Sequence, residues 1–550
     1  MGNRNVIMEN IIKDKDSAYA YLKTSPMFKL SLSSKELFHS NFLEWLSNVN
    51  ENAFKDLILK MAGIEKDKYK WPEVWRVKRE YNNFDLCVVA YDQYSEDTEN
   101  EKVDDDEDFR ILFVIENKVK SIPYKEQLER YTLEAENKNL AYWKNRGNDL
   151  FENALKEYGN NDDKDDGKYW IGVDEGSWVL KKGIKSGRGK DAKWSEVKKL
   201  IPATDDGKWK NNKTNFIEYY AELGKNQNPP IHYILLSLAK NFPEYDGKNV
   251  WKVKMKDSKD NEKEIDWKVC NYLDYKSKIE KAFENVSNGL YSQIINDYCK
   301  FIECLTTLSS KWEKDYGETE KFLSKNENYK DAHQFRIHDL YQKLKFSYLC
   351  TQLFNIINNN YGTESEYEYT VYPSNQAGLF KEKKTEFKYS DKYICVNYTY
   401  LHGDPLLEIN VHPICENGDE LYYAIQVQGN AYEHGIQVKK NDDTIKILKK
   451  QQDEVFSETV WNRLEDGNIK IIPNWMNIKT FSNWEKTDWM DDPNPENKRS
   501  SKKPYNKYDM NDGTYVYQKY IIRDVKIKQV LDQMLCDLEQ IIKSVNEIKL

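Results

Sequence analysis

Two charged residues at the end of an apolar run have the types and spacing needed for metal-dependent chemistry. Residues 109–115 are apolar apart from one arginine, and Glu116, Asn117 and Lys118 follow directly. Side chains two positions apart in a strand point to the same face, so Glu116 and Lys118 would project together. Asn117 would point away and leave its backbone carbonyl near a bound metal. A carboxylate binds a hard cation, and a neighbouring lysine can orient water and offset negative charge.

A second carboxylate is expected from the preceding strand. Residues 84–90 form a short, bounded apolar run that contains Asp85, which is typical of a buried strand. Antiparallel pairing of 84–90 with 109–115 would place Asp85 opposite the end of its partner strand, close to Glu116. Charges also mark the ordinary ends of strands, but two acids and a lysine at one edge favour metal-assisted hydrolysis of a phosphodiester.

Helices are expected on both sides of these strands. Ser33 and Glu36 have the spacing of a capping box, and apolar residues then recur at helical spacing up to position 46. Pro123 precedes a second helix, expected over about 124–135. The order is therefore helix, three strands and helix, since a further strand-like stretch begins at position 74.

This arrangement resembles the PD-(D/E)xK nuclease superfamily, whose members have restriction-endonuclease-like folds. Residues 127–131, QLERY, match the QxxxY motif of its RecB-type branch in spacing and position. Residues 36–43 are similar to the first helix of a bacterial family in this superfamily. The resemblance is specific over 33–131, weaker over 231–360 and faint beyond. One departure is Phe84, which stands before Asp85 where the superfamily pattern has proline.

The resemblance implies a site for Mg²⁺ or Mn²⁺. Asp85 and Glu116 would bind the metal, and Glu36 would support it or a second ion. Lys118 would assist the water that attacks the phosphorus.

The same resemblance places Gln127 and Tyr131 on the helix that lines the site, in contact with metal-bound water or substrate phosphate. The implied activity is that of a nuclease, with DNA as the favoured substrate. A role in bacterial defence against foreign DNA fits many members of the superfamily.

Lysines and one arginine concentrate between residues 181 and 193, with Trp178 and Trp194 on either side. Cationic loops with aromatic residues suit phosphate contact and base stacking, although charge runs are also common on solvated surfaces. The residues of this stretch predicted to contact nucleic acid are Lys182, Lys185, Arg188 and Lys190.

The composition is that of a folded protein with a very polar surface. The 550 residues include 39 Tyr and 15 Trp and carry a net charge of −9, which speaks against indiscriminate nucleic-acid binding but allows a local basic groove. The sequence contains no apolar run of about 18 residues, so no membrane span is expected, and no secretory leader is evident. The eight cysteines form no CxxC pair, so we expect a reduced cytoplasmic protein without structural zinc. No GxxxxGK[ST] motif indicates a nucleotide cofactor.

The fold class expected is α/β, with a restriction-endonuclease-like mixed sheet core flanked by helices, a large insertion, and an α+β C-terminal region that contains an antiparallel sheet. After the strand expected at 231–238, a loop is expected up to Trp267. Five segments follow from this reading: the N-terminal part of the nuclease core (1–135), an insertion that could contact substrate (136–230), the rest of the core (231–290), a helical region (291–360) and the C-terminal region with a terminal helix (361–550).

Two rival interpretations stay open on sequence alone. A nuclease fold could have lost catalysis and serve to bind nucleic acid or a protein partner. In a purely structural protein, Glu116 would be a simple strand end, and Asp85 and Glu116 would lie far apart. His39, one helical turn after Glu36, could reach the cleft or belong to the core. Endonuclease or exonuclease action, strandedness and oligomeric state are not predicted.

Overall fold

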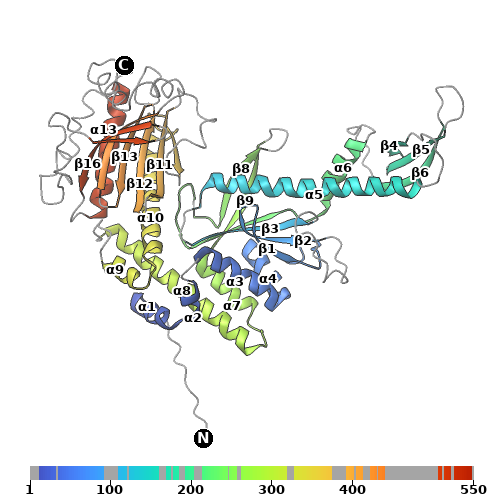
Figure 1. Ribbon diagram of the computed structural model, residues 1–550, viewed down its shortest axis with the longest axis horizontal. Helices are drawn as coiled ribbons and strands as arrows, with labels where there is room; N and C mark the ends of the chain where they lie inside the picture. The colour runs from blue at the N-terminus through green and yellow to red at the C-terminus, as the bar shows by residue number, and fades with distance from the viewer. Residues whose placement is uncertain are drawn as a thin grey trace, which may run out of the picture.

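The chain folds around three β-sheets (Figure 1). The computed structural model describes residues 12–31, 35–91, 109–119, 123–159, 169–174, 177–184, 193–202, 213–245, 247–256, 262–318, 327–374, 392–401, 404–412, 421–429, 431–439, 506–510, 513–521 and 526–547. Ser33 lies outside these residues, and so does the expected capping box.

The six-stranded sheet positions the candidate site. Its order is β1-β2-β3-β7-β9-β8. The antiparallel strands β1, β2 and β3 lead into the parallel strands β3, β7 and β9, and β8 returns antiparallel to β9. The bounds are β1 (Arg76–Tyr81), β2 (Phe84–Ala90), β3 (Arg110–Lys118), β7 (His232–Ser237), β8 (Val250–Lys256) and β9 (Glu262–Asn271).

Helices cover both faces of this sheet (Figure 1). On one face lie α3 (Lys35–Val49), α4 (Glu51–Ala62) and α7 (Tyr272–Ala282), and on the other lies α5 (Lys125–Gly159). Every residue of β3 is buried, as expected for a central strand covered on both sides. The expectation of a mixed α/β sheet flanked by helices is confirmed.

The strand pairing inferred from the sequence is also confirmed. Strands β2 and β3 are antiparallel, with Leu86 opposite Ile115, so Asp85 and Glu116 come next in register. The strand expected at 231–238 is β7. The prediction of a loop between β7 and Trp267 was wrong, because β8 and the first half of β9 form a hairpin there.

Helix α5 is much longer than expected. It was predicted to end near Ala135 but continues to Gly159, because its second half packs on α6 (Lys213–Gln227). At that contact, a Cβ atom on Gly224 would lie 2.5 Å from the Trp143 ring, so only glycine allows the approach. The far half of α5 is thus held by a helix that follows it in the chain.

A small unit lies at the far end of α5 (Figure 1). It contains the three-stranded sheet β4-β5-β6 and a hydrophobic cluster of its own that includes Phe151, Trp178, Phe216 and Tyr219. The strands are β4 (Tyr169–Asp174), β5 (Ser177–Ile184) and β6 (Lys193–Pro202). This cluster is separate from the main core.

The C-terminal sheet has the order β10-β11-β12-β13-β14-β16-β15. All neighbours are antiparallel, as expected, except the parallel pair β10 and β11. Helices α10 (His338–Tyr361) and α13 pack against it, and the main hydrophobic core continues from the first sheet into this region. The bounds are β10 (Thr370–Ser374), β11 (Tyr393–Leu401), β12 (Asp404–His412), β13 (Leu421–Gln428), β14 (Ala431–Lys439), β15 (Asn506–Met510), β16 (Gly513–Ile521) and α13 (Ile527–Glu547).

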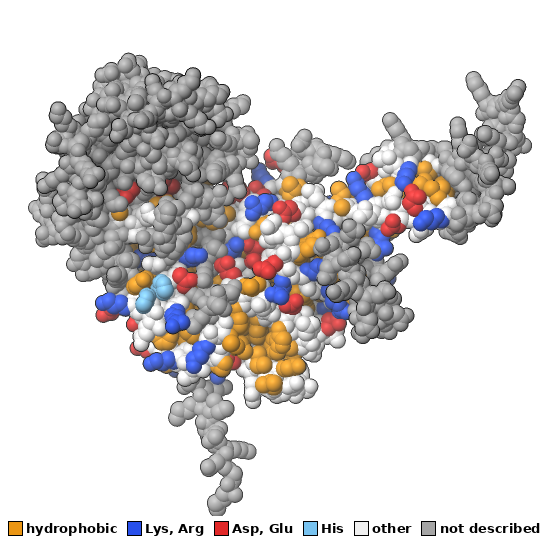
Figure 2. Space-filling view, viewed as in Figure 1, with side chains coloured by type: hydrophobic (Ala, Val, Ile, Leu, Met, Phe, Trp, Pro, Cys, Tyr) orange, Lys and Arg blue, Asp and Glu red, His pale blue; other side chains and the backbone are white. Residues whose placement is uncertain are grey.

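The remaining helices are α1 (Lys15–Thr24), α2 (Pro26–Ser31), α8 (Gly289–Glu318) and α9 (Glu327–Gln334). Figure 2 shows apolar side chains gathered over α7 and the start of α8, where Leu273 and Leu290 are 53% and 62% exposed. None of the helices in the described part of the chain combines the length and apolarity that crossing a membrane requires.

Candidate active site

The end of β3 carries a buried ion pair. The Nζ atom of Lys118 lies 2.5 Å from Oε1 of Glu116, and the two residues are 9% and 1% exposed. They share a face of β3 because they are two positions apart. The pair therefore has the common orientation that the ExK spacing predicts.

Asp85 lies beside this pair, on the neighbouring strand. Its Oδ2 atom accepts a 2.7 Å hydrogen bond from the backbone N–H of Asn117. This side-chain hydrogen bond continues the contact between β2 and β3 beyond their last backbone pair. It also fixes the Asp85 carboxylate next to Glu116. The structure thus brings together the two acids predicted as metal ligands.

Burial and charge perturb all three ionisable groups. Burial, together with the carboxylates of Asp85 and Glu36, raises the pKa of Glu116 to about 7 despite the opposing ammonium of Lys118. Burial likewise raises the pKa of Asp85, against the effects of Lys118 and the Asn117 N–H. Burial alone would lower the pKa of Lys118, but Glu116, Asp85 and Glu36 outweigh it and raise that pKa. Lys118 therefore stays protonated, while Glu116 titrates near neutral pH.

Helix α5 supplies two further predicted residues. The Nε2 atom of Gln127 donates to Oε1 of Glu116 at 3.1 Å and to the Tyr131 hydroxyl at 2.8 Å. Residues four apart on a helix share a face, which is why both side chains reach the end of β3. Burial and the nearby Glu116 carboxylate raise the pKa of Tyr131, so its hydroxyl keeps a proton for donation.

Glu36, in the first turn of α3, contacts the same strand end. Its Oε1 atom accepts a 3.2 Å hydrogen bond from the backbone N–H of Val119. Its charge reaches Asp85, Glu116 and Lys118 and contributes to their pKa shifts. Glu36 therefore belongs to the cluster and also anchors α3 to the end of β3.

A hydrogen bond between Asn117 and Tyr272 supports the site from the opposite face of β3. The sequence did not predict this contact. Asn117 points to the opposite face of β3, as expected, where its Nδ2 donates to the backbone carbonyl of Glu36 at 3.0 Å. Its Oδ1 accepts a short hydrogen bond from the Tyr272 hydroxyl at the start of α7. Asn117 is 1% exposed. An asparagine inside an apolar strand could have indicated a buried hydrogen bond. Its partner Tyr272, however, is distant in the sequence and could not be identified from it.

Other residues considered from the sequence have structural roles or lie elsewhere. His39 is fully buried, its Nδ1 is 2.7 Å from the Tyr298 hydroxyl, and burial lowers its pKa to about 3, so it belongs to the core. Lys182 lies on β5 in the outlying unit. Lys185, Arg188 and Lys190 lie outside the described residues.

The residues at the end of β3 suit a single hard cation that keeps several water ligands. They do not form a metal site in which protein side chains supply every ligand. No group of three His, Cys, Asp or Glu side chains within the described residues could hold a metal by itself. However, the buried Oε2 atom of Glu116 accepts no hydrogen bond from any described donor when the carboxyl groups are ionised. Mg²⁺ is commonly held by one or two carboxylates together with waters and substrate phosphate. Asp85 and Glu116 supply such a donor set.

Glu116 should make the stability of the metal-free protein depend on pH. Its folded pKa of about 7 exceeds the usual value of 4.5, so its contribution is complete below pH ~4.5 and is lost as the pH rises through ~7. We expect Glu116→Gln, which cannot ionise, to gain up to about 3 kcal/mol relative to the parent between pH ~4.5 and ~8. Denaturant unfolding in a chelator at both pH values measures this difference.

Glu262→Gln is the matched control for that experiment. Glu262 lies on β9 in the same sheet, and its side chain is 62% exposed, 3.6 Å from Lys254. Its substitution should change stability by less than about 0.5 kcal/mol at either pH. Equal pH profiles for the parent and Glu116→Gln would contradict the raised pKa.

No protein-family model, curated protein or solved structure matches this chain.

Proposed function

We propose that this chain is a divalent-metal-dependent nuclease of the PD-(D/E)xK superfamily with a restriction-endonuclease-like core. The observation that carries the proposal is the convergence of Asp85, Glu116 and Lys118 at one edge of the six-stranded sheet. The chain order α3, β1, β2, β3 and α5 supports it, because it is the order on which the resemblance depends.

The side chains divide the chemistry among themselves. Asp85 and Glu116 would hold Mg²⁺ or Mn²⁺, which when bound lowers the pKa of a coordinated water and offsets charge on the phosphate. The Lys118 ammonium remains protonated beside Glu116, where it can orient the attacking water and stabilise charge that develops on phosphate oxygens. Gln127 orients Glu116, and Tyr131 can donate its proton to a phosphate oxygen.

The substrate proposed is nucleic acid, with DNA favoured by the resemblance, and a cytoplasmic role in bacterial defence is proposed on the same ground. Lys182, Lys185, Arg188 and Lys190 are proposed as substrate contacts. An inactive binding module is the alternative, but buried carboxylates would repel phosphate in a protein that only binds. The clustered acids therefore favour catalysis.

The test combines cleavage with metal binding. The purified full-length protein should cut DNA with Mg²⁺ or Mn²⁺ and not in a chelator. Calorimetry should detect a Mn²⁺ site that Asp85→Asn weakens by at least about tenfold, because that change removes a charged ligand.

Asp274→Asn serves as the control, because Asp274 is a half-exposed aspartate on α7 that lies 3.4 Å from Lys278. It should leave Mn²⁺ affinity unchanged. Nucleic-acid binding without any Mn²⁺ site or cleavage would favour the inactive module and overturn the proposal.

A further inference from the structure

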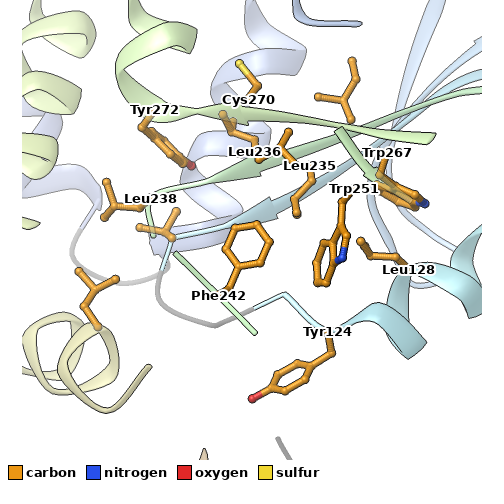
Figure 3. Packing of buried hydrophobic residues seen from close by; sticks show 14 of the residues in the cluster. Tyr124, Leu128, Leu235, Leu236, Leu238, Phe242, Trp251, Trp267, Cys270 and Tyr272 are labelled. Atoms are coloured by element: carbon orange, nitrogen blue, oxygen red, sulfur yellow. The ribbon is translucent and has the colours of Figure 1, made fainter. Parts of the chain in front are cut away.

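A second feature lies at the same edge of the six-stranded sheet. A pocket of about 370 Å³ opens where β7 and β9 end, between the start of α7 and the second half of α8. Its walls include Leu238, Asn271 and Tyr272. Figure 3 shows Leu238 and Tyr272 near the ends of these strands, beside the core residues Leu236 and Cys270.

Strand register relates this pocket to the candidate active site. Lys118 on β3 is paired with Ser237 on β7, and Ser237 is paired with Asn271 on β9. Neighbouring strands are roughly 4.8 Å apart, so the backbone at Asn271 lies about 10 Å from that at Lys118. Ligands of parallel sheets bind at the carboxyl ends of the strands, and both features occupy this end.

Tyr272 connects the pocket to the strand that carries the site. It lines the pocket, and its hydroxyl donates to Asn117, which stands between Glu116 and Lys118 in β3 and points to the opposite face of the strand. The pocket and the active site therefore share a structural element rather than occupying unrelated surfaces.

The pocket carries an excess of positive charge. Lys13, Lys240, Lys311 and Lys314 line it. None of the four has a carboxylate within 4 Å among the described residues, in contrast to the lysines of the site and of the sheet surface. The one acid in the lining is Glu303, which lies 3.4 Å from Lys276.

Neutral donors add to these charges. Thr306, Thr307 and Ser310 project from α8 into the lining, and Lys240 donates to the Ser310 hydroxyl at 2.9 Å. Lysines together with hydroxyl groups are the side chains that contact phosphate oxygens in nucleic-acid complexes. The start of α7, capped by Asn271, adds the partial positive charge of a helix N-terminus.

We infer that this pocket binds backbone phosphates of the nucleic-acid strand whose phosphodiester bond is cut at Glu116 and Lys118. The inference rests on the proposed nuclease function and adds a place where the strand is held. The separation of about 10 Å between the backbones at Lys118 and Asn271 corresponds to roughly three base steps along the axis of a duplex, at ~3.4 Å of axis per phosphate of one strand. The strand would cross the ends of β3, β7 and β9 between the two features.

The test removes three of the pocket lysines together. Lys240→Ala, Lys311→Ala and Lys314→Ala are combined in the full-length protein, with Glu116→Gln added to prevent cleavage. Losing three phosphate contacts should reduce the slope of log affinity against log salt by about two to three and weaken DNA binding roughly tenfold to a hundredfold at ~0.1 M salt. Fluorescence anisotropy over a salt series measures both quantities.

A matched variant removes the same charge elsewhere. Lys60, Lys281 and Lys528 are exposed lysines on α4, α7 and α13 that do not line the pocket, and their joint replacement by alanine in the same background should leave the salt slope within about 0.5 of the parent value. Circular dichroism verifies that both triple variants are folded.

Three outcomes would overturn the inference. Unchanged DNA affinity and salt slope in the pocket variant would refute it, and if the protein with Glu116 intact still cuts DNA the nuclease proposal survives. If adenosine monophosphate or inorganic phosphate stabilises the parent but not the pocket variant while DNA binding is equal, the pocket belongs to a free nucleotide or phosphate. If the parent neither binds nor cuts DNA, the proposed function fails and the inference fails with it.

Discussion

Replacing Lys118 by alanine should lower the rate of metal-dependent cleavage by about 10²- to 10³-fold, the usual loss when a group that stabilises transition-state charge is removed. The Lys118 ammonium is buried, 2.5 Å from Glu116, and water entering the space cannot supply a fixed positive charge. Its removal also leaves the carboxylates of Glu116, Asp85 and Glu36 without their main compensating charge. The pKa of Glu116 in the metal-free protein should then rise further, so Mn²⁺ must displace a proton up to a higher pH and the Mn²⁺ affinity near pH ~7 should fall. Single-turnover rates at saturating Mn²⁺ measure the first effect, and Mn²⁺ titrations across pH 6 to 9 measure the second.

Lys252→Ala is the control for this loss. Lys252 also lies on a strand of the six-stranded sheet and pairs with a glutamate, at 3.1 Å from Glu264, but its side chain is 63% exposed. Exposed pairs contribute little, so this variant should cut as the parent does and keep the same pH profile. If Lys118→Ala cut within threefold of the parent rate, Lys118 would have no catalytic role.

Replacing Asn117 by alanine should reduce the free energy of unfolding by about 2 to 4 kcal/mol. The change leaves the buried Tyr272 hydroxyl without its acceptor, which costs about 1 to 3 kcal/mol, and removes one hydrogen bond to the Glu36 carbonyl, which Ser40 also contacts, at a net cost of about 0.5 to 1.5 kcal/mol. Cleavage should also slow by up to about 10²-fold, since displacements of about 1 Å in a catalytic group have that effect. Denaturant unfolding and single-turnover rates measure the two losses.

Two further variants separate the causes. Tyr272→Phe removes only one of the two hydrogen bonds and should cost about 1 to 3 kcal/mol. Asn285→Ala removes an exposed asparagine whose amide contacts only Glu284 among the described residues, and it should cost less than about 0.5 kcal/mol. A stability for Asn117→Ala equal to that of Asn285→Ala would show that Asn117 does not hold α3 and α7 to β3.

The sequence was sufficient where structure depends on local pattern. Strands β2 and β3 are short apolar runs, with Asp85 near the start of β2 and Glu116 near the end of β3. Antiparallel strands this short can pair in only a few registers. Asp85 therefore lies beside Glu116, as expected. The ExK spacing also determined the opposite orientations of Glu116 and Asn117, because alternation in a strand is a purely local property.

The parts that the sequence did not reveal depend on contacts between distant segments. Tyr272 reaches Asn117 only because β9 is the second neighbour of β3 in the sheet, and no local signal encodes that neighbour. Helix α5 continues past Ala135 because α6 packs along it, and its mostly polar composition gave no sign of that support. The β8–β9 hairpin was missed because the strands are polar on one face and the sequence between them is charged.

Helix α5 also has a mechanical consequence. Its 35 residues span about 50 Å at 1.5 Å per residue, with Gln127 and Tyr131 near one end and the small three-stranded sheet at the other (Figure 1). The part of this helix that packs on β3 and β8 is continuous with the part that carries the outlying unit. A force applied to the outlying unit would therefore be transmitted along the helix to the side chains of Gln127 and Tyr131 beside Glu116.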